Sequence, residues 1–126
     1  FHDTGLAAWL LGVREPKHVS AHPLRGGLFE NWVATEIVKA QAARGEPPAL
    51  GFLRDREGHE VDAIVERAGR IHAIEIKSGQ TIASDFFDDL DFWRAQLPDT
   101  AITPWLVYGG DKVQSRERGN VVPWSQ

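Results

Sequence analysis

The chain has 126 residues, of which 42% are hydrophobic and 25% charged, and its formal net charge is −4. This length suggests one domain, and the composition is ordinary for a soluble globular protein. The absence of cysteine excludes disulfide frameworks, thiolate zinc sites and cysteine nucleophiles, and it fits a cytoplasmic location. No apolar run is long enough to span a membrane, so we expect no membrane partner.

The negative net charge argues against a strong autonomous DNA binder, because neutralisation of phosphates supplies most of such affinity. It argues less against a metal-dependent nuclease, whose carboxylates lower the formal charge until cations bind. The chain also lacks methionine and begins at Phe1. We therefore expect it to be a piece of a longer protein.

The first part of the chain has helical patterns. Residues 3–12 predict a short apolar helix whose start Asp3 or Thr4 can cap. Residues 13–24 contain two prolines and predict a connector. From about residue 24 to residue 44, apolar side chains recur at three- and four-residue spacing, which predicts a long helix.

The second part alternates between strands and one helix. Ser84 can cap a helix that runs to about Gln96. The order of helix, three strands, helix and strand predicts an α/β fold, in which antiparallel hairpins and one parallel crossover form a mixed sheet between helices. Strands are expected at residues 50–54, 60–66, 71–77 and 103–108, followed by a weak edge hairpin whose second arm is 120–124.

The most informative residues are at the end of the strand 71–77. Glu75 and Lys77 are two residues apart, so a strand places them on the same face. Taken alone, they are most simply interpreted as a surface ion pair. A hairpin turn at residues 67–70 would set Asp62 opposite Glu75, with Cβ atoms about 4.5–5.5 Å apart. Two carboxylates that close repel each other unless a cation lies between them.

These three side chains together indicate a metal-type site, active or vestigial. Carboxylates on neighbouring strands suit Mg²⁺ or Mn²⁺, which prefer oxygen ligands and retain waters. Lys77 adds a positive charge near the charge that develops in phosphodiester cleavage. Strict alternation along the strand would put Asp62 and Ile64 on one face and Val61 on the other.

Two further sets of residues are less specific. Glu30 lies at the border of the apolar stripe of the long helix, and by itself it is most simply a solvated helix residue. The five tryptophans are interpreted mainly as packing residues. Nothing in the sequence favours base stacking by Trp105 or Trp124.

Three segments carry a family resemblance: Gly27–Asn31, Glu60–Asp62 and Glu75–Gly79. In order and placement they resemble the PD-(D/E)xK nuclease superfamily, and more closely the uncharacterised C-terminal domain of bacterial and archaeal AAA-type ATPases. The segment Phe1–Ala7 also matches how that domain tends to begin, so the resemblance covers nearly the whole chain. The proline that usually precedes the first Asp is absent, since Val61 stands there.

The resemblance implies a restriction-endonuclease-like fold with an α-β-β-β-α-β core. Residues 24–126 would form the nuclease-like domain, and residues 1–23 would form its N-terminal edge. Asp62 and Glu75 would be metal ligands, and Lys77 would position or activate the attacking water. Glu30 would be the accessory helix acid, catalytic and metal-binding. The cofactor would be Mg²⁺ or Mn²⁺.

The resemblance also implies partners. These are DNA and an ATPase module in the same full-length chain, with ATP bound outside the present residues because they contain no ATPase motif. The first functional hypothesis is thus a metal-dependent DNA nuclease domain. The alternative is a catalytically silent module of the same fold that binds DNA or protein and regulates the ATPase. A structural or oligomerisation domain is the third option.

Overall fold

Pro47 and Pro48 separate a helical first part of the chain from a β-rich second part. Proline has no backbone N–H to donate and cannot continue a helix, so the long helix has to end before this pair. The computed structural model describes residues 2–126. The chain divides into one unit that ends at Pro48 and a second unit, Ala49–Gln126.

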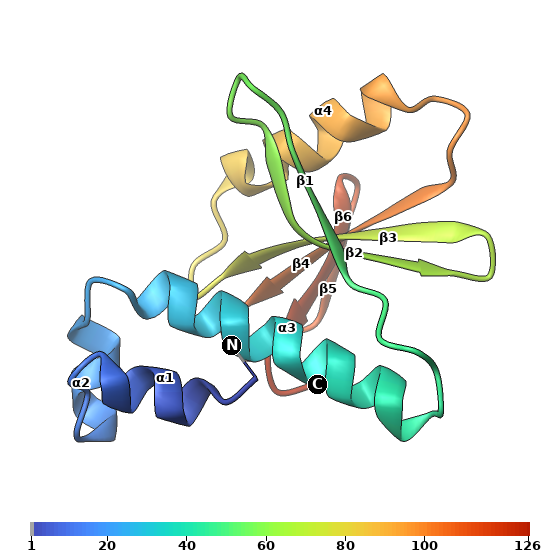
Figure 1. Ribbon diagram of the computed structural model, residues 1–126. Helices are drawn as coiled ribbons and strands as arrows, with labels where there is room; N and C mark the ends of the chain where they lie inside the picture. The colour runs from blue at the N-terminus through green and yellow to red at the C-terminus, as the bar shows by residue number, and fades with distance from the viewer. Residues whose placement is uncertain (1) are drawn as a thin grey trace. The chain divides into compact units, whose positions relative to one another are not determined.

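The first unit consists of helices α1 (Thr4–Leu10), α2 (Pro16–Ala21) and α3 (Arg25–Ala43) (Figure 1). The predicted cap is confirmed, because the Asp3 side chain accepts a hydrogen bond of 2.9 Å from the Leu6 N–H. Across the described residues, none of the helices combines the length and apolar character that crossing a bilayer requires.

The prediction of a connector over residues 13–24 was wrong in part, because α2 lies within it. Pro16 occupies the first position of this helix. Proline suits that position, since the N–H it lacks would have no partner inside the helix and its φ already fits the helix. Pro16 therefore marks the start of a short helix, and Pro23 lies beyond its end.

Within the described residues, six strands of the second unit form one mixed sheet in the order β1-β2-β3-β4-β6-β5. This confirms the predicted α/β class and mixed sheet. The chain passes from β3 through a 3₁₀ turn (Ser84–Phe87) and helix α4 (Asp88–Gln96) to β4, which pairs parallel to β3. The strands are β1 (Gly51–Arg54), β2 (Glu60–Arg67), β3 (Arg70–Lys77), β4 (Ile102–Tyr108), β5 (Gln114–Arg116) and β6 (Gly119–Pro123).

The two ends of the sheet differ in strand direction. β1, β2 and β3 pair antiparallel, whereas β3, β4 and β6 run parallel. The predicted edge hairpin is β5–β6, and its second arm lies between β4 and the first arm. The carboxyl ends of β3, β4 and β6 therefore lie side by side, with Lys77 paired to Tyr108 and Tyr108 paired to Pro123.

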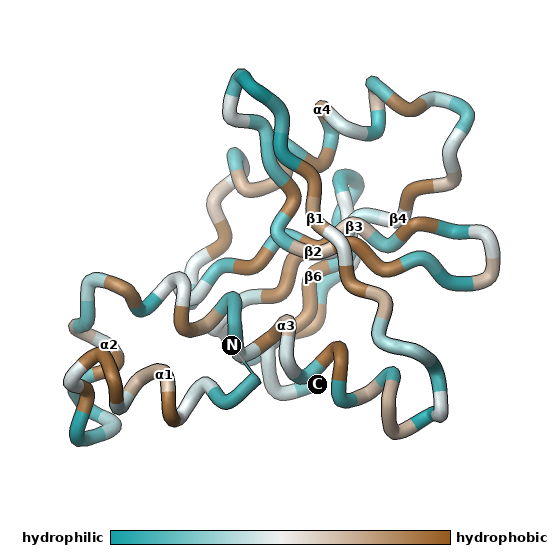
Figure 2. The backbone as a smooth tube through the Cα atoms, viewed as in Figure 1, coloured by the Kyte–Doolittle hydropathy of each residue, from teal (hydrophilic) through white to brown (hydrophobic). Residues whose placement is uncertain are grey.

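The core of this unit lies between the sheet and α4. Phe87 and Leu90 come from the turn and the helix and are almost fully buried. Figure 2 shows the apolar character of the strands in the middle of the sheet and the hydrophilic tip of the β1–β2 hairpin. The buried cluster consists of Val61, Ala73, Phe87, Leu90, Leu106, Tyr108 and Val121.

A β-bulge in β2 changes which side chains face this core. Gly51 pairs with Ile64 and Leu53 pairs with Val61, so β2 advances three residues where β1 advances two. The extra residue falls in the segment that contains Asp62, and such a bulge bends the strand and interrupts alternation. Val61 and Ile64 consequently both pack in the core cluster. The prediction of strict alternation from Val61 to Ile64 was wrong for this reason.

A close backbone contact joins the ends of β3 and β4. The Gly109 N–H donates to the carbonyls of Lys77 and Gly79, with both N···O distances at 3.0 Å. A Cβ at Gly109 would lie 2.3 Å from the carbonyl oxygen of Ser78. Only glycine lets the segments that follow β3 and β4 approach this closely. Gly109 therefore fixes the position of the backbone that follows Lys77.

We expect Gly109→Ala to lower the free energy of unfolding by about 1–3 kcal/mol, the usual cost of an overpacked site. Urea denaturation followed by circular dichroism measures this change. Gly79→Ala is the matched control, because a Cβ at Gly79 meets nothing within 4 Å. Equal stability of the two variants would contradict the close contact.

Candidate functional site

Glu75 and Lys77 form an ion pair on one face of β3, as their spacing predicted. Lys77 Nζ lies 2.5 Å from Glu75 Oε1. The ammonium also lies 5.6 Å from the centre of the Phe86 ring, in a cation–π geometry. The Lys77 side chain is 33% exposed but that of Glu75 only 6%. The simple interpretation as a surface ion pair therefore does not hold, because the carboxylate is buried.

The buried Glu75 carboxyl is incompletely satisfied. Oε2 is buried and has no hydrogen-bond partner among residues 2–126, while Oε1 faces Lys77. Burial raises the pKa of Glu75 to about 7; the contact with Lys77 opposes this rise and the charge of Asp62 adds to it. A buried oxygen without a partner costs about 1–3 kcal/mol. The unpaired oxygen and the raised pKa both mark Glu75 as an unusual group in the interior of this unit.

Asp62 is held next to Glu75 by the backbone of β3. Its Oδ2 accepts a hydrogen bond of 2.8 Å from the Ile76 N–H. Burial raises the pKa of Asp62, and this hydrogen bond and the charge of Lys77 oppose the rise. This hydrogen bond fixes one of the two oxygens of the carboxyl group.

The predicted hairpin register is confirmed only in part. Glu66 pairs with Ile71 as expected, but the ladder ends at Ala63 and Ile74. The predicted ladder pair of Asp62 with Glu75 is not formed, because the β2 bulge begins there and the Asp62 side chain takes the next N–H of β3. The two carboxyl groups are nevertheless near enough for the charge of Asp62 to raise the pKa of Glu75.

Asp89, in the first turn of α4, is an acidic neighbour that the sequence analysis missed. Its charge raises the pKa of both Asp62 and Glu75. Its Oδ1 lies 2.9 Å from His59 Nδ1, and the His59 ring stacks on Phe92 with the ring centres 3.8 Å apart. The hydrogen bond to Asp89 raises the pKa of His59. The tip of the β1–β2 hairpin is thereby tied to α4 (Figure 1).

The remaining predicted site residue, Glu30, belongs to the other unit. It lies in α3 and its side chain is exposed. Asp62, Glu75 and Lys77 all belong to Ala49–Gln126. The role of Glu30 as an accessory acid therefore stays a prediction.

The residues at this site suit a hard divalent cation. Asp62 and Glu75 offer carboxylate oxygens, one of them buried and without a partner. Mg²⁺ is commonly bound by one or two carboxylates together with waters and substrate phosphates. Two carboxylates beside a lysine are thus a sufficient protein contribution to such a site.

A second group of possible ligands lies in the β1–β2 turn. Of the described residues, Asp55, Glu57 and His59 are the set of three whose ligand atoms lie within 4.8 Å of one another. Asp55 Oδ1 already accepts the N–H groups of Glu57 and His59, each at 2.9 Å, and His59 Nδ1 faces Asp89. These contacts explain the cluster as the hydrogen bonding of a tight turn.

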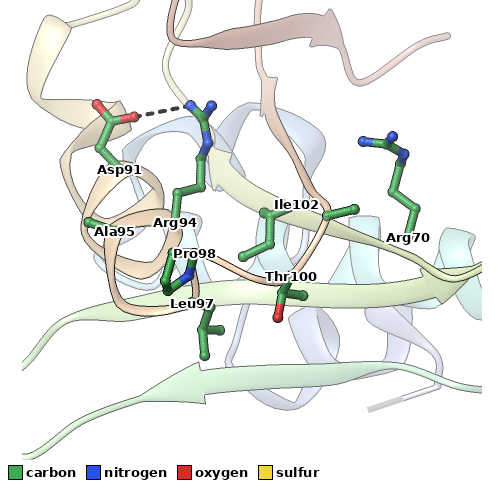
Figure 3. Close-up of a pocket in the computed structure, with 9 residues that line it drawn as sticks. Arg70, Asp91, Arg94, Ala95, Leu97, Pro98, Thr100 and Ile102 are labelled. Atoms are coloured by element: carbon green, nitrogen blue, oxygen red, sulfur yellow. Dashed lines mark ion pairs between the residues drawn. The ribbon is translucent and has the colours of Figure 1, made fainter.

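Another pocket, of about 460 Å³, lies at the far end of the sheet (Figure 3). Arg94, which pairs with Asp91, and Arg70 line it. Arg70 begins β3 and Lys77 ends it, so their Cα atoms are about 23 Å apart along an extended strand. This pocket is therefore separate from the acidic site.

In the metal-free chain, Glu75 should make the protein less stable as the pH rises. The folded state raises the pKa of this carboxyl from 4.5 to about 7, so between these values the folded chain keeps a proton that the unfolded chain releases. Glu75 alone should lower the free energy of unfolding by about 3 kcal/mol over this window. The raised pKa values of Asp62 and His59 act in the same direction. Glu75→Gln should remove the part of the slope that Glu75 contributes.

Urea denaturation at several pH values between 4.5 and 8 measures the effect. Glu117→Gln is the control, because Glu117 is an exposed acid away from the site, and it should keep the wild-type slope. A Glu75→Gln variant whose stability varied with pH as the wild type's does would show that Glu75 is not the buried titrating group.

Comparison with known proteins identifies a family. No curated protein and no solved structure matches this chain. A protein-family model described as "Domain of unknown function (DUF4143)" matches residues 25–126, which is well over half of the chain. The match includes every predicted site residue, from Glu30 in α3 to Lys77 at the end of β3. The chain therefore belongs to the DUF4143 family.

Proposed function

We propose that the Ala49–Gln126 unit carries a Mg²⁺- or Mn²⁺-dependent nuclease site that hydrolyses phosphodiester bonds of DNA. The observation that carries the proposal is the buried Oε2 of Glu75, which has no partner and lies beside a second carboxyl group, that of Asp62. Burying a carboxyl group without satisfying it is costly, and a cation would offset this cost. The resemblance to PD-(D/E)xK nucleases assigns the same two residues as ligands.

Asp62, Glu75 and Lys77 would have different roles in the reaction. Asp62 and Glu75 would hold the cation, which when bound supplies an acidified water and neutralises phosphate charge. Lys77, held beside Glu75 and over the Phe86 ring, would place its ammonium next to the charge that develops on the phosphate.

The wider assignment follows from the family resemblance. We infer that the chain acts in the cytoplasm as part of a longer protein with an AAA-type ATPase module. DNA would be the shared substrate, with ATP bound by the other module. Glu30 would act as an accessory acid of the site.

The 126-residue chain should nick or degrade DNA in the presence of Mn²⁺, and a chelator should abolish this activity. Asp62→Asn and Lys77→Ala should each lower the rate about 100-fold or more, because each removes a group that holds or stabilises transition-state charge. Gel electrophoresis of plasmid DNA over time measures the rate. Glu30→Gln should lower it as well if Glu30 is the accessory acid.

Glu117→Gln is the matched control, since Glu117 is an exposed acid of the same unit away from Asp62. It should keep wild-type activity. Cleavage by Asp62→Asn at the wild-type rate would refute the site assignment, because a nuclease contaminant or another site would then be responsible.

A second function is supported by the ion pair itself and by the net charge. Lys77 already holds one oxygen of Glu75 at 2.5 Å, and the chain carries a net charge of −4. Both features fit a catalytically silent module that binds DNA or protein and regulates the ATPase. Calorimetric titration with Mn²⁺ separates the two functions. A nuclease should take up Mn²⁺ and lose this uptake in Glu75→Gln, whereas a silent module should take up none.

A further inference from the structure

A pocket of about 450 Å³ lies just beyond the carboxyl ends of the three parallel strands. Its lining comes from the segments that follow β3, β4 and β6. Ligands of open α/β sheets bind in this position, outside the carboxyl ends of the strands. The lining residues are Gln80, Gly109, Gly110, Asp111, Trp124 and Ser125.

The backbone around this pocket is held by specific contacts. Gly109 donates to the carbonyls of Lys77 and Gly79, and the Trp124 N–H donates to the Tyr108 carbonyl at 3.0 Å. The Tyr108 hydroxyl donates to the Lys112 carbonyl at 2.9 Å and accepts from the Lys112 N–H at 3.0 Å. These contacts fix the backbone on two sides of the pocket.

The two glycines of the lining pack closely against neighbouring residues. A Cβ at Gly110 would lie 2.1 Å from the Tyr108 ring, and a Cβ at Gly109 would lie 2.3 Å from the Ser78 oxygen. This tight packing holds the backbone on that side of the pocket in place.

The chemistry of the lining points to a neutral aromatic ring with polar edges. Trp124 is 47% exposed and offers an indole face for stacking. Gln80, Asp111 and Ser125 offer an amide, a carboxylate and a hydroxyl group for hydrogen bonds. No lysine or arginine lines the pocket, and the Asp111 carboxylate would repel a phosphate, so the pocket suits a base rather than a backbone.

The position of the pocket relates it to the acidic site. Gly109, which lines the pocket, donates a backbone hydrogen bond to the carbonyl of Lys77. The side chain of Lys77 belongs to the acidic site. A nucleotide with its base in the pocket would thus lie at the same end of the sheet as Lys77. A base can enter such a pocket only if it is unpaired or turned out of a duplex.

We propose that this pocket binds one unpaired nucleobase of single-stranded DNA by stacking on Trp124. The proposal rests on the proposed nuclease function for its choice of substrate, and it specifies that substrate as single-stranded. The base contact positions the strand, and the acidic site acts on a phosphate next to it.

Binding is measured by fluorescence anisotropy with a short, labelled, mixed-sequence DNA strand and the full 126-residue chain in EDTA, so that cleavage does not interfere. The wild type should bind the single strand more tightly than the same sequence as a duplex. Trp124→Ala should weaken binding about 5- to 150-fold, the range that stacking of one base supplies. Trp124→Phe should restore most of the affinity.

Trp9→Ala is the matched control, because Trp9 is 56% exposed but lies in the other unit. It should leave affinity unchanged, and circular dichroism should show both variants folded. Equal affinity of the wild type and Trp124→Ala, or preference for the duplex, would overturn the proposal. Tighter binding of RNA of the same sequence would overturn the assignment to DNA.

The outcomes separate this proposal from the nuclease function. If the wild type cleaves DNA with Mn²⁺ but Trp124→Ala binds and cleaves normally, only the base pocket is refuted. If binding depends on Trp124 but no cleavage occurs with Mn²⁺, the pocket stands and the nuclease function is refuted.

Discussion

The burial of Glu75 between the sheet and the residues that follow β3 is the constraint on which the candidate site depends. Burial favours the protonated form of this carboxyl group. On the same strand, the contact with Lys77 opposes protonation. The contact satisfies one oxygen and leaves the other without a partner. The bulge that turns Asp62 toward the Ile76 N–H adds a second carboxyl group at the same place. The chain thus accepts a local loss of stability at one position of an otherwise apolar strand.

This arrangement could be predicted in outline because its parts are local. Glu75 and Lys77 share a face through the two-residue period of a strand, and the turn after Arg67 fixes the pairing of β2 with β3. The bulge at Asp62 could not be predicted, since alternating apolar residues are compatible with a regular strand. It became visible only through the pairing of β2 with β1.

Contacts between residues far apart in the chain were the other part that the sequence did not reveal. Asp89 and His59 are separated by 30 positions, and each is unremarkable in its own segment. Likewise, Trp124 follows a short edge strand, and only the parallel pairing of β6 with β4 places it beside the end of β3. The hydrophobic periodicity of a helix or strand describes one element at a time, so it carries no information about contacts between distant elements. From α3 onward the order of the elements was predicted correctly, because it depends on patterns within single elements.

The hairpin that joins β2 to β3 has a consequence for the order in which the site assembles. Its two turn residues, Ala68 and Gly69, both have positive φ, the conformation of the tightest β-hairpins. Hairpins of this kind close within about 1–10 μs, whereas parallel pairing has to wait for a long crossover. The two carboxylates are thus brought together by nearby contacts, and the Trp124 pocket by distant ones. The acidic pair therefore depends on the pairing of β2 with β3, whereas the Trp124 pocket depends on the pairing of β4 with β6.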